Sequence, residues 1–212
     1  MAVGTVRREV ILHAAAKLFA AKGVSASTVR EIADAVGMRS GSLYHHFDSK
    51  ASMVEAIIVE YLDDLRKRYA TVVAANADPR SCLEALVRES LATVEAHPYA
   101  TEIYQNDLTF LRTLPGYEYL RTAAADVQQT WLTVIKAGAR AGVFRSDIQP
   151  EVFYRFIRDT VWLSVRWFKL TRAYPMSKLA DDCISIFLDG FATASPTRPA
   201  RRSTGPAPAP SP

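Results

Sequence analysis

The stretch that decides the fold is TVREIADAVGMRSGSLYHHFDSK, residues 28–50. Its first half has the signals of one short helix with a marked beginning and a marked end. Thr28 and Glu31 have the spacing of a capping box, in which the hydroxyl accepts the amide of the third helical residue and the carboxylate reaches back. Gly37 is expected to end this helix, because glycine readily takes the left-handed conformation found after a helix.

A second short helix is expected over residues 41–47, with Ser40 as its N-cap. Two short helices joined in this way form a helix-turn-helix, whose second helix lies in the major groove while the first lies across the DNA backbone. The second helix and its flanks are rich in side chains that can donate hydrogen bonds, and the helix dipole favours phosphate at its start. These side chains belong to Arg39, Ser40, Ser42, Tyr44, His45, His46 and Lys50.

Helical patterns continue on both sides of this stretch. Val10, Ala14 and Leu18 recur at the spacing of one helix face, and Gly23 is expected to end that helix. Ser49 or Asp48 can cap a longer helix. No segment alternates convincingly as a strand would, so the predicted class is all-α, with a small head and a larger helical body. Further helices are expected over residues 50–74, from 79 to the break at 97–98, and over 117–141, 150–171 and 177–191.

Composition and charge limit the possible functions. Of the 212 residues, 49% are hydrophobic and 23% charged, which is typical of a globular protein and excludes disorder of the whole chain. The formal net charge is +4, and residues 1–50 hold seven Lys and Arg against four Asp and Glu. A mild excess of positive charge concentrated in the head permits a nucleic-acid partner. We expect a DNA-binding domain over 1–50 and an effector-binding and dimerisation domain over 51–194.

The end of the chain has a different composition. Residues 195–212 contain six of the eleven prolines and no aromatic residue, so we expect a disordered tail. Cys82 and Cys183 are too few for a disulfide framework and are expected to be reduced and mostly buried. No metal-ligand spacing appears, and no apolar run is long enough for a signal peptide or a membrane span. The sequence therefore predicts a cytoplasmic protein without a cofactor or metal.

The stretch at 28–50 resembles the DNA-binding head of the TetR family of transcriptional regulators. The resemblance covers about the first 55 residues and is specific in residue type and spacing. It implies an all-helical homodimer, a palindromic operator, and a pocket in the body whose ligand controls the affinity for DNA. It rests on Thr28-Val29-Arg30-Glu31-Ile32-Ala33, Val36-Gly37, Ser40-Gly41-Ser42-Leu43-Tyr44-His45-His46-Phe47 and Ser49-Lys50.

The resemblance also implies roles for single residues of the head. Thr28 matches a helix cap that contacts phosphate, although it would cap its helix with or without DNA. Tyr44 and His45 match residues that contact the DNA backbone and bases, and Lys50 matches a lysine that holds phosphate. Arg39, Ser40 and Ser42 match the entrance to the groove. By contrast, Leu43 and Phe47 are expected in the core, and His46 is expected to pack between helices.

A second candidate site lies on the helix expected over residues 151–169. On a helical wheel, five side chains fall within one arc of about 100°, and several apolar side chains fall on the opposite side. An exposed amphipathic face is one interpretation. The other is an anion site, because a buried arc of three arginines with one acid would require an anion, and tryptophan offers a stacking surface. The arc holds Arg155, Arg158, Asp159, Trp162 and Arg166, and the opposite side includes Phe153, Phe156, Ile157, Thr160, Ser164 and Trp167.

This helix narrows the resemblance to one branch of the family. Its residues 154–167, together with Ile103-Tyr104-Gln105, look like the corresponding segments of actinobacterial repressors of sterol-ring catabolism. Those repressors release DNA when they bind the coenzyme A thioester of a partly degraded steroid. The resemblance implies an acyl-CoA effector and five effector-binding residues, which are Tyr104, Gln105, Arg158, Trp162 and Arg166.

Two other functions compete with this one. A repressor that senses a cationic or hydrophobic drug would place acids and aromatics around its ligand; Arg158 and Arg166 argue against it, whereas Glu102 and Asp107 leave it open. An enzyme is disfavoured because no GxSxG motif, paired carboxylates or metal motif appears. We therefore expect a ligand-released repressor in which the helix beginning at Lys50 links the head to the body.

Overall fold

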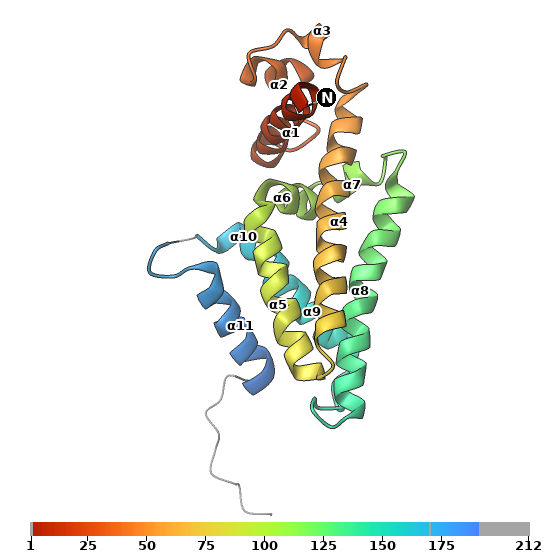
Figure 1. Ribbon diagram of the computed structural model, residues 1–212, viewed down its shortest axis with the longest axis vertical. Helices are drawn as coiled ribbons and strands as arrows, with labels where there is room; N and C mark the ends of the chain where they lie inside the picture. Colours follow the sequence, from red (N-terminus) through yellow and green to blue (C-terminus); the bar gives the residue numbers. More distant parts are fainter. Residues whose placement is uncertain (1, 170, 191–212) are drawn as a thin grey trace, which may run out of the picture.

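The computed structural model describes residues 2–169 and 171–190, and every regular element in those ranges is a helix. The predicted all-α class is confirmed. Figure 1 shows an elongated molecule with α1, α2 and α3 at one end and the remaining helices in a body below them. The helices are α1 Ala2–Lys22, α2 Val29–Ala35, α3 Ser40–Leu43, α4 Lys50–Ala75, α5 Pro79–Ala96, α6 Pro98–Asn106, α7 Leu108–Leu111, α8 Tyr117–Arg140, α9 Pro150–Trp162, α10 Ser164–Trp167 and α11 Met176–Asp189.

The local signals of the head are present as predicted. The Glu31 amide donates to Thr28 Oγ1 at 3.2 Å, and the Thr28 amide donates to Glu31 Oε2 at 2.9 Å, which completes the capping box of α2. Gly23 follows α1 at a φ of +82° and Gly37 follows α2 at +65°, where other residues would be strained. The start of α2 and the ends of both helices are therefore set by local sequence.

The second short helix differs from the prediction. Helix α3 begins at Ser40 rather than after it and ends at Leu43, and Arg39 occupies the N-cap position without a side-chain hydrogen bond. Residues 44–46 form turns instead of continuing the helix. The chain turns here because Phe47 must reach the core and because Ser49, in an extended conformation, caps the start of α4.

The Glu31 carboxylate gives a first testable prediction. A hydrogen bond from Lys22 Nζ, 2.6 Å away, and further bonds from the Thr28 amide and hydroxyl lower the pKa of Glu31 from 4.5 to about 2. A lowered pKa in the folded state stabilises the protein above pH 4.5, and this contribution is lost as the pH falls toward 2. Urea unfolding at pH 7 and pH 3 is expected to show a smaller loss of stability for Glu31→Gln than for the wild type. Equal losses would contradict the role of this carboxylate.

Helix α4 connects the head to the body and forms the centre of the packing (Figure 1). Its buried face contacts α5 and α8, and α11 packs on the far side of α5. A chain of hydrogen bonds joins three of these helices: Trp131 Nε1 donates to the Tyr69 hydroxyl at 2.9 Å, and that hydroxyl lies 2.5 Å from Ser90 Oγ. Ser90 Oγ in turn donates to the Leu86 carbonyl at 2.6 Å. Buried polar groups are thus paired between helices.

Tyr69→Phe is expected to destabilise the fold by about 1–3 kcal/mol, because it leaves the buried Trp131 N–H without an acceptor. Denaturant unfolding followed by tryptophan fluorescence measures this effect. Tyr44→Phe, which removes a hydroxyl from an exposed side chain of the head, is the matched control and is expected to change stability by less than about 0.5 kcal/mol. A similar value for both variants would show that the buried bond contributes nothing.

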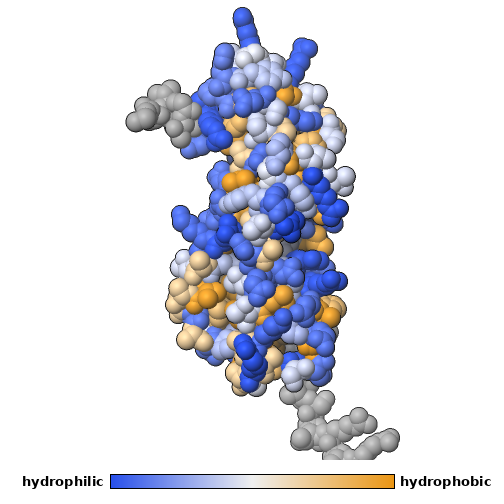
Figure 2. Space-filling model, turned by 90° about the vertical axis from the view of Figure 1, so that its right-hand side faces the viewer, coloured by the Kyte–Doolittle hydropathy of each residue, from blue (hydrophilic) through white to orange (hydrophobic). Residues whose placement is uncertain are grey.

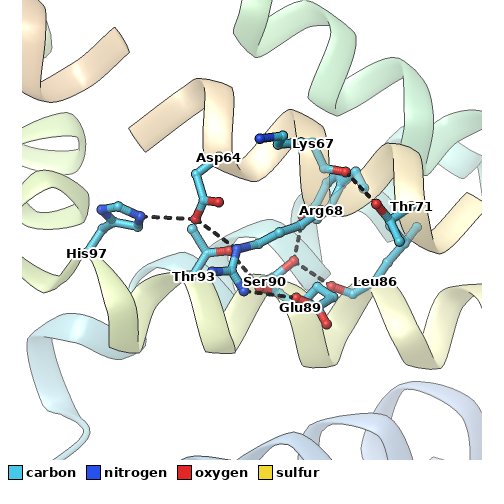
Figure 3. Close-up of polar contacts among 10 residues, drawn as sticks. Asp64, Lys67, Arg68, Thr71, Leu86, Glu89, Ser90, Thr93 and His97 are labelled. Atoms are coloured by element: carbon cyan, nitrogen blue, oxygen red, sulfur yellow. Dashed lines mark hydrogen bonds and ion pairs between the residues drawn. The ribbon is translucent and has the colours of Figure 1, made fainter. Parts of the chain in front are cut away.

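A group of charged residues on one side of α4 fixes the junction of α5 and α6. Figure 3 shows the Asp64 carboxylate between two partners: Arg68 Nε donates to it at 2.8 Å, and His97 Nε2 lies 3.0 Å from it. Arg68 also donates to Glu89 at 3.2 Å. Burial acts to raise the pKa of Asp64, but the hydrogen bonds from Arg68 and His97 outweigh it and keep that pKa below its usual value. The carboxylate therefore stays charged and ties α4 to the start of α6.

Two expectations about the last helices need correction. The single helix expected over 150–171 is broken at Leu163 into α9 and α10. The last helix begins at Met176, one residue before its expected start, with Pro175 at its N-cap. The expected end of that helix at residue 191 and the expected disordered tail at 195–212 lie outside the described residues.

The cysteines agree with the prediction, since Cys82 and Cys183 are both buried free thiols. Burial raises the pKa of each thiol, which disfavours the reactive thiolate. Within the described ranges, no helix combines the length and the hydropathy that a membrane crossing requires.

Candidate DNA-binding face and effector site

The predicted DNA-contacting residues gather at the end of the molecule formed by α2, α3 and the turn that follows (Figure 1). Arg39, Ser42 and His45 are exposed, and half of the Tyr44 side chain is open to solvent, at 51%. Ser40 is half-buried at the start of α3. An exposed tyrosine beside exposed hydrogen-bond donors at a helix start suits contact with phosphates and base edges.

Thr28 and Lys50 have structural roles of their own. The exposed Thr28 side chain takes part in the capping box described above. Lys50 Nζ donates to the carbonyls of Val24 at 2.7 Å, Ser27 at 2.8 Å and Ser25 at 3.3 Å. The ammonium group thus binds three carbonyls of the loop between α1 and α2 and fixes this loop to the first turn of α4. Contact of Lys50 with phosphate remains a prediction.

The two side chains expected in the core are buried, and two arginines of α1 add contacts that the sequence pattern did not indicate. Leu43 and Phe47 are buried, and His46 is half-buried. The Arg8 guanidinium lies 4.8 Å from the centre of the Phe47 ring. Arg7 donates to the carbonyl of Val36 at 3.1 Å. Both arginines therefore connect α1 to the helix-turn-helix.

The predicted effector residues meet where α6, α9 and α10 approach α4. Trp162 is buried, at 5% exposure, and its ring meets that of Tyr61 edge-on at 6.2 Å between centroids. The Tyr104 ring lies 5.9 Å from the same Tyr61 ring. Tyr61, on α4, therefore connects the other two rings of this aromatic cluster. The sequence did not indicate this role, because nothing distinguishes Tyr61 from other core residues of a long helix.

The two arginines lie at the rim of this cluster. Arg166, on α10, donates to Asn106 Oδ1 at 2.5 Å and to the Gln105 carbonyl at 3.5 Å. Arg158, on α9, donates to Asp159 at 2.7 Å, and its side chain is 46% exposed. All five predicted residues are thus brought to one region, with the indole inside and the two guanidinium groups at the surface.

The premise that the arginine arc is buried is wrong for the single chain. Arg155, Arg158 and Arg166 are all exposed, and only Trp162 points into the core. The break at Leu163 also places Arg166 on a separate helix, α10, to which the continuous wheel does not apply. Conversely, Phe156, expected on the apolar side, is 68% exposed.

The positive charge of Arg158 acts on two phenols, the buried Tyr154 and the half-buried Tyr104. Burial raises the pKa of Tyr154 to about 12 and also raises that of Tyr104, while the positive charge of Arg158 acts in the opposite direction on both. A surface cation backed by apolar aromatic side chains is suited to an anion that carries an apolar or aromatic group.

Two cavities, each of about 800 Å³, are lined by residues other than these five. One is an open groove between α4 and α8 whose rim carries Arg66 and Lys67 and whose floor includes Tyr69. Figure 2, which faces the right-hand side of Figure 1, shows hydrophobic patches scattered among hydrophilic atoms on this side of the body. The other cavity lies between α1 and the α5–α6 junction. Its lining includes Glu9, His13, Glu60, Glu95 and Tyr99.

Comparison with known proteins gives consistent matches over most of the chain. Residues 11–57 match the family of bacterial regulatory proteins called the tetR family, and residues 76–191 match the tetracyclin repressor-like C-terminal domain. The chain is 44% identical to the HTH-type transcriptional repressor KstR2 of Rhodococcus jostii, over 88% of this chain and 92% of that protein.

Two solved structures extend the comparison. The structure of the ketosteroid transcriptional regulator KstR2 of Mycobacterium tuberculosis is 38% identical, covers 87% of this chain and 94% of that chain, and has a TM-score of 0.83. A structure of AibR in complex with isovaleryl coenzyme A and operator DNA has a TM-score of 0.77 over 87% of this chain and all of that chain; at 22% identity it shows the shared fold alone. The protein described here belongs to the tetR family of bacterial transcriptional regulators.

Proposed function

We propose that this transcriptional repressor acts as a homodimer that binds a palindromic operator, that an acyl-CoA releases it, and that it controls genes of sterol-ring catabolism. The observation that carries the effector assignment is the pair of surface guanidinium groups of Arg158 and Arg166 around the Trp162–Tyr61–Tyr104 cluster. Relatives that are 38–44% identical and include a ketosteroid regulator support the steroid assignment.

The chemistry of the site fits a CoA thioester. Arginine forms paired hydrogen bonds with phosphate, and an indole or phenol ring can stack on adenine or pack on an apolar acyl group. Gln105, which is half-buried, follows Tyr104 of the aromatic cluster, and its carbonyl accepts from Arg166 at 3.5 Å. The complex of AibR with isovaleryl coenzyme A indicates that a protein of this fold can hold such a ligand.

Dimerisation is supported by an apolar surface on α9, α10 and α11. Four large side chains of these helices are exposed by between 45% and 68%. Water contact with so many apolar groups is unfavourable, and a two-fold axis would bury the same surface of both subunits. A C2 dimer would also place two heads on the two halves of a palindrome. The four side chains, which we call the α9–α11 surface, belong to Val152, Phe156, Trp167 and Ile186.

Release of DNA then requires that the effector prefer one arrangement of the heads. A ligand shifts such an equilibrium only by its difference in affinity for the two arrangements, and emptying an operator needs a ratio on the order of 10²–10⁴. Tyr61 contacts Trp162 and lies on α4, which begins in the head. Helix α4 is therefore the element through which we expect the site to act.

A repressor that senses an organic cation is the second candidate. The cavity between α1 and the α5–α6 junction favours it, because that cavity carries three glutamates beside Tyr99 and His13. Cations bind well among carboxylates and aromatic rings. The two candidates differ in the charge of the ligand, so a single titration distinguishes them.

That titration is a mobility-shift assay with operator DNA selected from a random pool by the wild-type protein. The probes are the CoA thioester of a steroid-derived indane propionate, the free acid, free CoA, and an aromatic quaternary ammonium compound. We expect only the thioester to release the DNA. Release by the ammonium compound alone would establish the second candidate. No effect of the thioester at roughly 1,000 times its Kd, where linkage amounts to about 4 kcal/mol, would overturn the effector proposal.

Tyr44→Ala is expected to weaken operator binding about tenfold or more, because one lost contact to a base or phosphate costs about 1–3 kcal/mol. Affinity for the thioester is expected to be unchanged. Fluorescence anisotropy with labelled operator measures the first quantity, and Tyr119→Ala, at an exposed tyrosine of the body, is the control. Equal operator affinity for Tyr44→Ala and the wild type would remove Tyr44 from the DNA-binding face.

A further inference from the structure

The loop between α1 and α2 is held by a residue from the distant body as well as by the head. The Val24 amide donates to Asp107 Oδ1 at 3.3 Å, although the two residues are 83 positions apart. On the other side of the same residue, the Val24 carbonyl accepts from Lys50 at 2.7 Å. Val24 is fully buried, so water does not replace either partner. This residue is therefore a junction between the head, the body and the first turn of α4.

The loop is shaped to bring this amide to Asp107. Gly23 has a φ of +82°, which turns the chain out of α1. A Cβ at Gly23 would lie 3.8 Å from Asp107 Oδ1, so the backbone of the loop passes directly beside the carboxylate. Asp107 also closes α6, because its own amide donates to the Ile103 carbonyl at 2.9 Å. The carboxylate is thus fixed to the last turn of α6.

The same turn of α6 is held from the other side by a residue of the proposed effector site. Arg166 donates to Asn106 and Gln105, the two residues immediately before Asp107. Its guanidinium is exposed, so an anionic ligand can reach it. A phosphate or carboxylate that binds Arg166 would compete with the Asn106 side chain and the Gln105 carbonyl for its donors. The last turn of α6 would then lose its hydrogen bonds to α10.

We propose that Asp107 is a positioning residue that couples the effector site to the head: it passes a displacement of the last turn of α6 to the loop at Val24. The part of this proposal that concerns the effector rests on the function proposed above. The hydrogen bond between Asp107 and Val24 can be measured without any effector. By reciprocity, a change that weakens this coupling reduces the effect of effector binding on DNA affinity. It reduces the effect of DNA binding on effector affinity by the same factor.

The attachment is tested by the exchange rate of the Val24 amide hydrogen, measured by NMR on the full-length protein. Asp107→Ala removes the acceptor and is expected to speed Val24 exchange about tenfold, the size expected for one buried hydrogen bond. Asp107→Asn keeps a carbonyl oxygen at the same place and is expected to stay within threefold of the wild type. Exchange at Trp131, in the core of the body, is the internal reference and should not change.

Communication along α6 is tested by Arg166→Ala in the same experiment. We expect Val24 exchange to rise about threefold, because the turn that carries Asp107 is loosened. Unchanged exchange in Arg166→Ala would overturn the coupling, and unchanged exchange in Asp107→Ala would overturn the attachment. Equal acceleration in Asp107→Asn and Asp107→Ala would show that the charge and not the acceptor position matters, which also contradicts the proposal.

A second experiment tests regulation by comparing operator affinity with and without the steroid-derived CoA thioester. In the wild type and Asp107→Asn the thioester is expected to lower operator affinity by the same factor. In Asp107→Ala that factor is expected to fall at least fivefold. If the thioester does not lower the operator affinity of the wild type, the proposed function is refuted, but the exchange result is unaffected. If it lowers operator affinity by the same factor in all three proteins, only the coupling through Asp107 is refuted.

Discussion

Replacing Phe156 with glutamate is expected to make the protein monomeric and to lower its affinity for operator DNA at least a hundredfold. Phe156 is 68% exposed in the single chain and lies on the α9–α11 surface with Val152. Burying a phenylalanine contributes about 1.5–3 kcal/mol per subunit, whereas an unpaired carboxylate in an interface costs several kcal/mol. A monomer also loses the second half-site, and the gain from two linked sites is on the order of 10²–10⁴.

Analytical ultracentrifugation and operator anisotropy measure the two consequences in the same samples. Val73→Glu is the matched control: Val73 is an apolar residue of α4 that is 46% exposed and lies outside the α9–α11 surface. It is expected to remain dimeric and to bind DNA as the wild type does. A dimeric Phe156→Glu protein with normal affinity would show that the subunits meet through another face.

Replacing Arg158 and Arg166 together with alanine is expected to lower the affinity for the CoA thioester about a hundredfold or more. Each guanidinium can form a charge-assisted pair with phosphate, and hydrogen bonds to charged groups are worth about 1.5–3 kcal/mol each. Both side chains are exposed, and their hydrogen bonds are to Asp159, Asn106 and Gln105. Because such exposed pairs contribute little to stability, the fold is expected to survive the change.

Isothermal titration of the thioester into the free protein measures this loss. Arg140→Ala, at the end of α8, removes an exposed guanidinium elsewhere and is expected to keep the wild-type affinity. The variant with Arg158→Lys and Arg166→Lys is expected to bind with intermediate affinity. Lysine keeps the positive charge but cannot form the paired hydrogen bonds of a guanidinium group. Full affinity in the double alanine variant would place the effector elsewhere, and the groove between α4 and α8 would be the first alternative to probe.

The head could be predicted from the sequence almost entirely because its signals are local. The capping box at Thr28 and the glycines at 23 and 37 act within one turn of the residues they affect. The length of α3 could not be predicted in this way. It is set by the burial of Phe47 and by the start of α4, which are tertiary requirements.

The break between α9 and α10 shows a different limit. No glycine or proline marks it. Ser164 is buried and donates through Oγ to the Val161 carbonyl at 2.5 Å, and the Arg166 amide donates to the Leu163 carbonyl three residues back. A serine that bonds to a nearby carbonyl competes with the regular helix, but whether it does so depends on packing that periodicity does not reveal.

The same segment shows why a helical wheel could find the site residues and still misjudge their burial. A wheel separates faces but does not say whether a face meets the core, water or a second subunit. Phe156 and Trp167 fall on the apolar side and yet are exposed in the single chain, while Trp162 falls among charged residues and is buried against Tyr61. Tyr61 itself could be assigned only once α4 and α9 were seen together.

Native mass spectrometry of the protein mixed with its operator and the steroid-derived CoA thioester tests the central claim most directly, because one spectrum reports subunits, DNA and ligand together. We predict dimers with DNA and dimers with thioester, while dimers that hold both are a minor species that declines as the thioester is raised. An abundant complex of dimer, DNA and thioester, or DNA bound by single subunits, would contradict a repressor that is released by its ligand.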